Sequence, residues 1–298
     1  MLKFIISFYF MLLIISCGNN NKRENKFYTK EGYLVKCEYY SNGKLQNQII
    51  IMDSLKNEYV RLRYYEDGTF KDSMHFENNQ LVGKAKTFDK HDSTTCYYEY
   101  VAGKQNGEAK CFYFNGTISA YGLFEDDKQI GEWKFFHPNG QLATYQYQNH
   151  NGDIIYLRKY DNDGRLLKSM GSGIIKINYP PDTILVGNYI ATVTMATPPN
   201  CEVELIAGEI DTTTGKVFNT VPCEWKNKGD TITIMKNYSK QYLAVVESPI
   251  IYVVKKYNKT GKQYLGCLWK IKDLQTGKTE EGKSFIPVVI VKSKRTDC

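Results

Sequence analysis

A glycine in a turn recurs along the first half of the chain at almost constant spacing, and this recurrence constrains the fold more than any other feature. The turn positions are 24 or 25 residues apart, Asp92 stands where one glycine is missing, and the glycines are Gly43, Gly68, Gly116, Gly140 and Gly164. A second set keeps the 24-residue period nine residues before the turns, and consists of Gly83, Gly107 and Gly131. Two markers in phase indicate an internal repeat.

Each repeat is predicted to be a β-hairpin. An Asn-Gly or Asp-Gly pair between aromatic and β-branched runs is a strong hairpin signal, because glycine accepts positive φ without a Cβ clash. Since one hairpin is marginal in water, successive hairpins must pair edge to edge and bury their aromatic residues against neighbours. We therefore expect an all-β fold: a meandering antiparallel sheet of about six 24-residue β-hairpin repeats over residues 33–172, followed by a β-sandwich.

The most complete repeat copy lies at residues 131–142 and has the sequence GEWKFFHPNGQL. This pattern resembles the bacterial variant of the MORN repeat, whose members are often labelled antitoxin-like repeat proteins. The resemblance extends over residues 33–170 and is weakest at Asp92. It implies a meandering antiparallel sheet that is used for binding or spacing and has no active site.

The N-terminus has the features of a lipoprotein signal peptide, predicted over residues 1–16. An apolar stretch follows Lys3 and ends before Ser16, and it is too short to span a bilayer as a helix, which needs about 20 residues. The segment Ile14-Ile15-Ser16-Cys17 resembles the lipobox of bacterial lipoproteins, which implies that the Cys17 thiol receives a diacylglycerol and becomes the new N-terminus. An ordinary secretory signal is the alternative.

The compartment that follows from this signal is the bacterial cell envelope. Residues 17–32 are polar and are predicted to be the lipidated cysteine with a flexible tether. Gly18 is not the aspartate associated with retention in the inner membrane, which favours the outer membrane, on its periplasmic or surface face. Acyl chains such as palmitate would hold the protein at that membrane.

The 24-residue marker stops near Gly171, and residues 174–298 show no repeat. About seven short alternating runs separated by turn signals predict a β-sandwich of immunoglobulin-like kind. This region holds 17 Lys and Arg against 12 Asp and Glu, whereas residues 18–173 hold 21 against 20. The excess charge predicts a solvated face, or alternatively a contact with an acidic glycan or a phospholipid surface.

Cysteine placement suggests two cross-strand disulfides. Besides Cys17 there are seven cysteines, so at least one is free or pairs elsewhere. Cys96 and Cys111 would face each other across one hairpin, and Cys201 and Cys223 bracket a turn near residue 212. Exported proteins allow disulfides, so each pair is a candidate.

No catalytic or metal-binding motif stands out. There is no CxxC, no phosphate loop, no Gly-x-Ser-x-Gly elbow and no His-Glu pair of metalloprotease type, and the four histidines are not at metal-ligand spacing. We therefore expect no catalytic residue, no cofactor and no metal. Nucleic acid is not expected as a partner outside the cytoplasm.

These features favour a non-catalytic, envelope-anchored lipoprotein that binds or scaffolds a protein or a cell-envelope polymer through the repeat sheet and the β-sandwich. An antitoxin or immunity-like protein that neutralises a toxin is the second hypothesis. A glycan-acting enzyme is the third; it needs two carboxylates across a cleft, and the acidic residues here lie mostly at turns.

Overall fold

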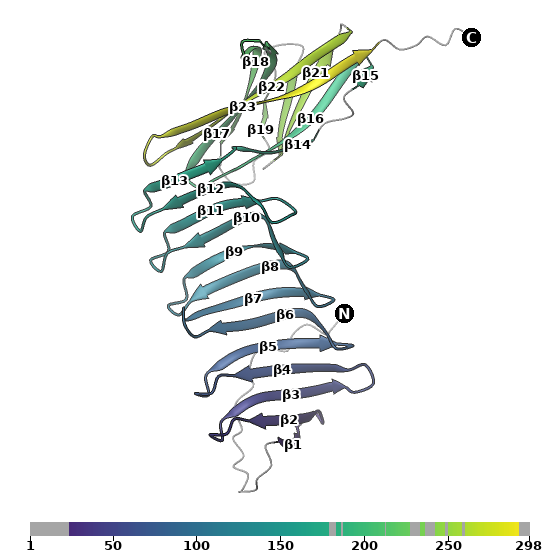
Figure 1. Cartoon of the computed structure of the whole chain (residues 1–298), viewed down its shortest axis with the longest axis vertical. Coiled ribbons are helices and arrows are strands. Elements are labelled where there is room, and N and C mark those ends of the chain that lie inside the picture. Colours follow the sequence, from purple (N-terminus) through teal and green to yellow (C-terminus); the bar gives the residue numbers. More distant parts are fainter. Residues whose placement is uncertain are drawn as a thin grey trace, which may run out of the picture. The chain divides into compact units, whose positions relative to one another are not determined.

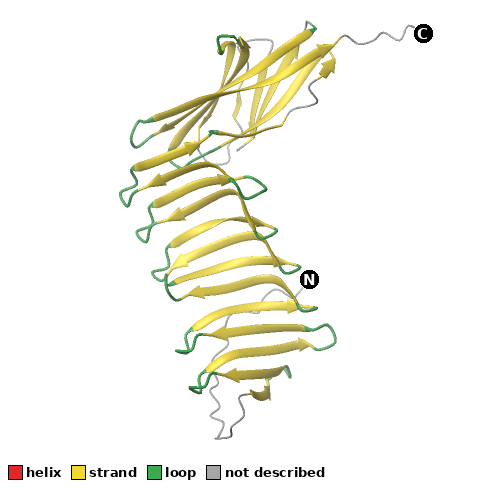
Figure 2. Cartoon of the chain, viewed as in Figure 1, coloured by secondary structure: helices red, strands yellow, loops and turns green. Residues whose placement is uncertain are grey.

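The computed structural model describes residues 24–178, 183–185, 187–211, 213–226, 233–235, 242–247, 250–257 and 260–291. Strands joined by turns and loops make up all of these residues, and no helix occurs among them (Figure 2). Over the same residues, therefore, no helix has the length and apolar character needed to cross a bilayer. The predicted lipidation site, Cys17, and the signal peptide lie outside the described residues.

Thirteen strands form one meandering antiparallel sheet, in which each strand is hydrogen-bonded to the next along the chain (Figure 1). The bounds are β1 (Glu24–Tyr28), β2 (Leu34–Tyr39), β3 (Leu45–Asp53), β4 (Glu58–Tyr64), β5 (Phe70–Glu77), β6 (Gln80–Asp89), β7 (Thr94–Val101), β8 (Lys104–Tyr113), β9 (Ile118–Glu125), β10 (Lys128–Phe136), β11 (Leu142–Gln148), β12 (Ile154–Tyr160) and β13 (Leu166–Gly171). The chain divides into two compact units, residues 1–79 and 80–298.

The repeated glycines occupy the same place in five turns. Each has φ between 79° and 91° and donates its N–H to the carbonyl three residues earlier, and these residues are Gly43, Gly68, Gly116, Gly140 and Gly164. A side chain at this φ would clash with the backbone, which is why glycine recurs. Near Asp92 the chain turns differently, with Ser93 at φ 52°.

The 24-residue period is also fixed by contacts between successive turns. The Asn42 amide donates to the Glu66 carbonyl at 3.0 Å, and the Asn139 amide donates to the Asn162 carbonyl at 2.8 Å. Asn42 and Asn139 therefore each satisfy a backbone acceptor one repeat further along. An insertion in one repeat would break this bond, so the contact favours units of constant length.

Ten further strands form two five-stranded sheets. Their bounds are β14 (Ile174–Asn178), β15 (Thr183–Leu185), β16 (Gly187–Met195), β17 (Cys201–Asp211), β18 (Lys216–Lys226), β19 (Thr233–Met235), β20 (Tyr242–Glu247), β21 (Ile250–Tyr257), β22 (Gly261–Asp273) and β23 (Thr279–Val291). One sheet has the order β14-β16-β21-β20-β19 and the other has the order β15-β23-β22-β17-β18. All pairs are antiparallel except β15 with β23, which is parallel.

The two small sheets share one hydrophobic core. Buried and less buried residues alternate along most of β17, as expected for a strand with one face inward. Its inward residue Leu205 belongs to the same buried cluster as Val193 of the other sheet. The cluster also contains Tyr145 and Tyr156 of the repeat sheet. The chain thus passes near Gly171 from the repeat sheet to the next sheet, and one buried cluster contains residues of both.

Arg158 on β12 is completely buried at this junction. Its guanidinium donates to the Asp273 carboxylate at 3.3 Å and to the Tyr156 hydroxyl at 2.8 Å, and it also donates to the Glu280 carboxylate. A fourth bond reaches the Cys201 sulfur at 2.8 Å. Buried charges are tolerated when they are paired and hydrogen-bonded, so these partners explain how an arginine can sit between the repeat sheet and the core.

The structure corrects two expectations from sequence. Residues 24–28 form β1, paired with β2 from Glu24–Glu38 to Tyr28–Leu34, so they are not part of a flexible tether. Backbone pairing needs no apolar alternation, which is why the polar composition did not predict this strand. The described residues after position 173 form ten strands instead of about seven, because three-residue strands such as β15 and β19 are too short to show alternation.

Candidate ligand-binding ladder on the repeat sheet

Lysine and tyrosine residues alternate in one row across the middle of the repeat sheet. Direct cross-strand partners are Lys86 and Tyr97, Tyr97 and Lys110, Lys110 and Tyr121, and Tyr121 and Lys134. Directly opposed residues point to the same face of a sheet. We call these five residues the lysine–tyrosine ladder.

The ladder is held together by contacts between ammonium groups and aromatic rings. The Lys86 nitrogen lies 5.7 Å from the Tyr97 ring centroid, and the Lys134 nitrogen lies 5.4 Å from the Tyr121 ring centroid. Such cation–π contacts contribute about 0.5–1 kcal/mol each at exposed sites. They also hold the ammonium groups over the sheet, so the charges are positioned before a ligand arrives.

Two phenylalanines flank the tyrosines on the same face. The Tyr97 and Phe112 rings meet edge to face with centroids 6.0 Å apart, and the Tyr121 and Phe136 rings stack at 5.7 Å. Tyr97 remains 41% exposed. The surface therefore presents aromatic rings together with the lysines.

The ladder has a signal in the sequence that is separate from the turn glycines. Tyr97, Tyr121 and Tyr145 are 24 residues apart, and the cations Lys86, Lys110, Lys134 and Arg158 follow the same period. Because each repeat adds two strands to the sheet, residues one repeat apart lie in line, two strands from one another. Comparing equivalent positions of the repeats for charge would have predicted the row.

The row of alternating basic and tyrosine residues continues beyond the ladder, where the C-terminal sheets cover it. Tyr145 pairs with Lys134, and Arg158 pairs with Tyr145. Both Tyr145 and Arg158 have no exposed surface. The Tyr145 hydroxyl donates to Glu132 at 2.6 Å and accepts from the Thr197 amide at 2.9 Å. Within the row from Lys86 to Arg158, therefore, the part that a ligand can reach is the ladder, from Lys86 to Lys134.

The opposite face of the same strands is packed more tightly. Trp133 is 3% exposed, donates its indole N–H to the Leu123 carbonyl at 3.0 Å and meets Phe124 edge to face at 5.1 Å. Gly122 leaves room for this ring, since a Cβ there would lie 2.3 Å from Trp133 Cδ2. The aromatic residues of this opposite face are thus largely buried by packing, whereas those of the ladder retain exposed ring surface.

Carboxylates lie beside the ladder and partly offset its charge. Glu132 lies 3.5 Å from the Lys134 nitrogen, and Glu99 lies 3.9 Å from the nitrogen of Lys84, which neighbours the ladder. The exposed Lys84–Glu99 pair contributes about 0–1 kcal/mol, so a ligand of suitable charge can compete for Lys84. The Lys134 and Glu132 side chains are less accessible, at 19% and 31% exposed. The ladder is therefore a cationic and aromatic row with a mixed polar border.

The structure contains the Cys96–Cys111 disulfide, in which the two residues are direct cross-strand partners on β7 and β8. It does not contain the second candidate pair, since Cys201 is free and buried. Cys223 pairs with Leu205, four residues from Cys201. At about 3.3 Å per residue this offset is about 13 Å, beyond disulfide reach. Burial raises the pKa of the Cys201 thiol to about 12.

The register explains why the second pairing was wrong. The innermost pair of the β17–β18 hairpin is Asp211 with Lys216, so the turn is centred beyond residue 212, and a register shift lies between Ala207 and Glu209. Both the position of the turn and the register shift move the partner of Cys201 further from Cys223. Cysteines equidistant from a turn face each other only in a regular hairpin, and a bulge in either strand shifts the pairing.

Comparison with known proteins supports the repeat assignment over part of the chain. Residues 129–149, which include β11 and all of β10 except Lys128, match the family described as "MORN repeat variant". No curated protein matches the chain.

Among solved structures, similarity is found to a point mutant of TarM from S. aureus in complex with fondaparinux, alpha-GlcNAc-glycerol and UDP, with 15% identity and a TM-score of 0.26. A second TarM structure matches with 15% identity and a TM-score of 0.24. These matches cover 37% and 36% of this chain but only 21% and 22% of the TarM chains. At such scores the similarity carries no conclusion about fold or activity.

Proposed function

We propose that this protein is a non-catalytic, lipid-anchored binding protein of the bacterial envelope, and that the lysine–tyrosine ladder binds an extended acidic polymer. The observation that carries the proposal is the direct register of alternating lysine and tyrosine residues from Lys86 to Lys134. A row of regularly spaced charges suits a ligand with regularly spaced charges of opposite sign.

The spacing of the ladder supports one class of ligand. Neighbouring strands lie about 4.8 Å apart, so lysines on alternate strands are about 10 Å apart. Lys86, Lys110 and Lys134 would contact anionic groups at that interval, while Tyr97 and Tyr121 between them offer ring faces to the intervening apolar surface of the polymer. A carboxylated or phosphorylated polysaccharide has both features.

The lipid anchor is proposed from the N-terminal sequence. The lipobox-like segment ending at Cys17 supports it, and an acyl chain on Cys17 would hold the repeats near an envelope polymer. Mass spectrometry of the mature protein tests this proposal: a diacylglyceryl cysteine as the first residue is expected. Unmodified Cys17 in protein isolated from its native membrane would contradict it.

We also propose that the two small sheets are an immunoglobulin-like sandwich. Their strand order supports it, since β14-β16-β21-β20 corresponds to strands A-B-E-D and β23-β22-β17-β18 corresponds to G-F-C-C′. The parallel pairing of β15 with β23 corresponds to an A′ strand beside G. An experimental structure in which β22 does not lie between β17 and β23 would contradict this proposal.

Binding of the full chain, purified in detergent, to polygalacturonate, polyphosphate and neutral dextran tests the ladder. We expect binding to an anionic polymer and none to dextran, with affinity that falls as salt rises. Lys86→Gln with Lys110→Gln should weaken it more than about tenfold, because hydrogen bonds to charged groups contribute about 1.5–3 kcal/mol each. Lys128→Gln, an exposed lysine outside the ladder, is the control.

Three results would contradict the proposal. These are equal affinity for dextran, no dependence on salt, and an effect of Lys128→Gln equal to that of the double ladder variant. Tyr97→Ala separates the aromatic contribution from charge, because it removes an exposed ring and leaves the lysines in place.

A further inference from the structure

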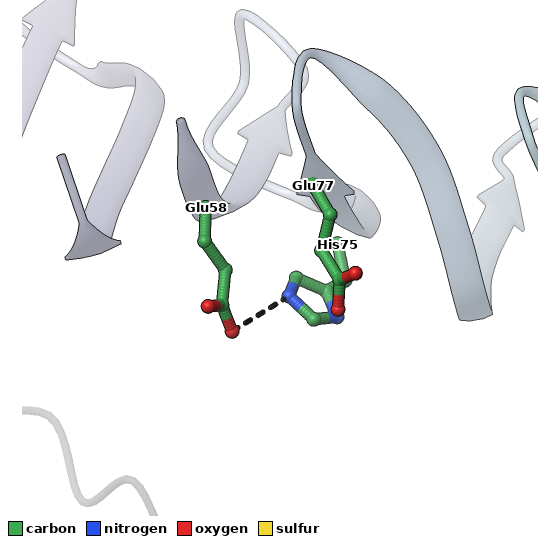
Figure 3. A group of neighbouring side chains, drawn as sticks. All are labelled: Glu58, His75 and Glu77. Carbon is green, nitrogen blue, oxygen red and sulfur yellow. Dashed lines mark ion pairs between the residues drawn. The ribbon is translucent and has the colours of Figure 1, made fainter. Parts of the chain in front are cut away.

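Glu58, His75 and Glu77 form a cluster on β4 and β5 that the spacing of histidines in the sequence did not predict. Val60 pairs directly with His75, and Tyr59 pairs with Phe76. One step beyond this last pair lie Glu58, the first residue of β4, and Glu77, the last residue of β5. Because alternate residues of a strand share a face, Glu58 and Glu77 project to the same face as His75, as Figure 3 shows.

The geometry of the cluster suits one metal ion. One ligand atom from each residue can be chosen so that all three atoms lie within 4.8 Å of one another. The His75 Nε2 atom lies 3.5 Å from the Glu58 carboxylate (Figure 3). A tetrahedral ion with bonds of about 2.0–2.1 Å holds its ligand atoms about 3.3 Å apart. The Glu58–His75 pair is already close to this spacing, and Glu77 is exposed and can rotate toward it.

The same Nε2 atom is shielded from water and has no hydrogen-bond partner. A buried nitrogen without a hydrogen bond is costly, and each such group in a folded protein requires an explanation. The Glu58 carboxylate, 3.5 Å away, pairs with this nitrogen only when the imidazole is protonated, whereas coordination of a metal ion through the lone pair would supply a partner for the neutral form. The neutral form of the imidazole is also the form that binds metal ions.

Charge in the surrounding strands also favours a cation. Like charges close together on neighbouring strands destabilise a sheet, and carboxylate oxygens of Glu58 and Glu77 lie within 4.8 Å of each other. On its other side, Glu58 pairs with Asp53 of β3. The Asp53 carboxylate accepts hydrogen bonds from the Leu55 and Lys56 amides at 2.9 and 3.2 Å, so it is occupied. The glutamates remain the available carboxylate ligands.

We propose that Glu58, His75 and Glu77 bind a divalent first-row transition metal ion, with zinc as the probe. Imidazole with carboxylates suits zinc, copper, iron and nickel, whereas calcium and magnesium prefer oxygen ligands alone. Three protein ligands leave a position for water or for a group of a ligand. This site lies in the unit of residues 1–79 and is independent of the lysine–tyrosine ladder.

Calorimetric titration of zinc into the metal-free full chain, without an affinity tag and in detergent, tests the site. We expect one zinc ion per chain and an unfolding temperature that rises with zinc concentration. His75→Gln and Glu77→Gln should each weaken this binding by more than about tenfold, because even residues that only support metal ligands contribute about 10–100-fold. Circular dichroism establishes that each variant is folded.

His150→Gln is the matched control. His150 also contacts a glutamate, at 2.8 Å from Glu125, but that pair is exposed and belongs to no group of three candidate metal ligands among the described residues. The control should bind zinc as the wild type does. Absence of zinc binding by the wild type, or equal binding by His75→Gln, would overturn the proposal. A tighter complex with calcium than with zinc would overturn the assignment of the metal class.

Discussion

Replacing Arg158 with methionine tests how the repeat sheet is joined to the C-terminal core. The Arg158 side chain is fully buried, and its guanidinium lies 3.3 Å from the Asp273 carboxylate. It also pairs with the Glu280 carboxylate. The two acidic side chains are themselves only 6% and 24% exposed. Methionine fills a similar volume but leaves these carboxylates without their cation.

The magnitude follows from charge and burial. Two unit charges 3.3 Å apart attract by about 5 kcal/mol at an effective dielectric constant of about 20. Desolvation costs several kcal/mol for each buried ion, so the intact network is close to balance. Removal of Arg158 abolishes the attraction while the carboxylates stay buried. We therefore expect Arg158→Met to lower the free energy of unfolding by about 3–5 kcal/mol.

Denaturant unfolding followed by tryptophan fluorescence measures this loss, since Trp269 is part of the hydrophobic core. Lys104→Met is the control, because the Lys104–Asp126 pair spans 3.6 Å with both side chains more than half exposed. That variant should lose less than about 1 kcal/mol. The difference between the two variants isolates the effect of burial.

A triple variant distinguishes charge from packing. In Arg158→Met, Asp273→Asn and Glu280→Gln, the amides keep a hydrogen-bond acceptor and carry no charge, so at least half of the lost stability should return. A loss below about 1 kcal/mol for Arg158→Met would refute the reasoning. A triple variant as unstable as the single one would assign the loss to packing.

Three further predictions concern other parts of the structure. Replacing Cys96 and Cys111 with alanine should lower the free energy of unfolding by about 2–3 kcal/mol, because the disulfide closes a loop of 15 residues. Urea unfolding measures this loss, and an unchanged free energy would contradict the prediction. Gly122→Ala should cost about 1–3 kcal/mol, because its Cβ would lie 2.3 Å from Trp133, and an unshifted melting temperature would contradict the clash. Burial raises the pKa of the Tyr160 hydroxyl to about 12, whereas an unfolded tyrosine ionises near pH 10. Tyr160 therefore contributes stability that is fully present below about pH 10 and is lost as the pH rises through about 12. Ultraviolet titration in which all tyrosines of the folded protein ionise near pH 10 would contradict this prediction.

Much of the repeat sheet could be predicted from sequence because its information is local. The turn at Gly140 needs positive φ, and Asn139 beside it both shapes that turn and bonds to the next one. Such requirements act over a few residues and recur, so they are visible as a period. The strand β1 escaped prediction because backbone pairing left no apolar pattern in residues 24–28.

The candidate sites were less predictable because they depend on register. His75 and Glu58 are 17 positions apart in the sequence and meet only because Val60 pairs with His75. Conversely, Cys201 and Cys223 looked opposed, but Cys223 pairs with Leu205. Register depends on turn geometry and bulges, and a shift by a few residues changes every partner.

By itself, therefore, the sequence determined the hairpin, its period and the all-β class, because backbone φ at the turn glycines and aromatic strand runs are local properties. It also contained the 24-residue spacing of Tyr97 and Tyr121, although not their exposure. The tertiary structure decided which residues meet across strands, and that Arg158 is buried while Lys110 is exposed. The physical reason is that burial and cross-strand contact depend on what packs over a residue, which residues distant in the chain supply.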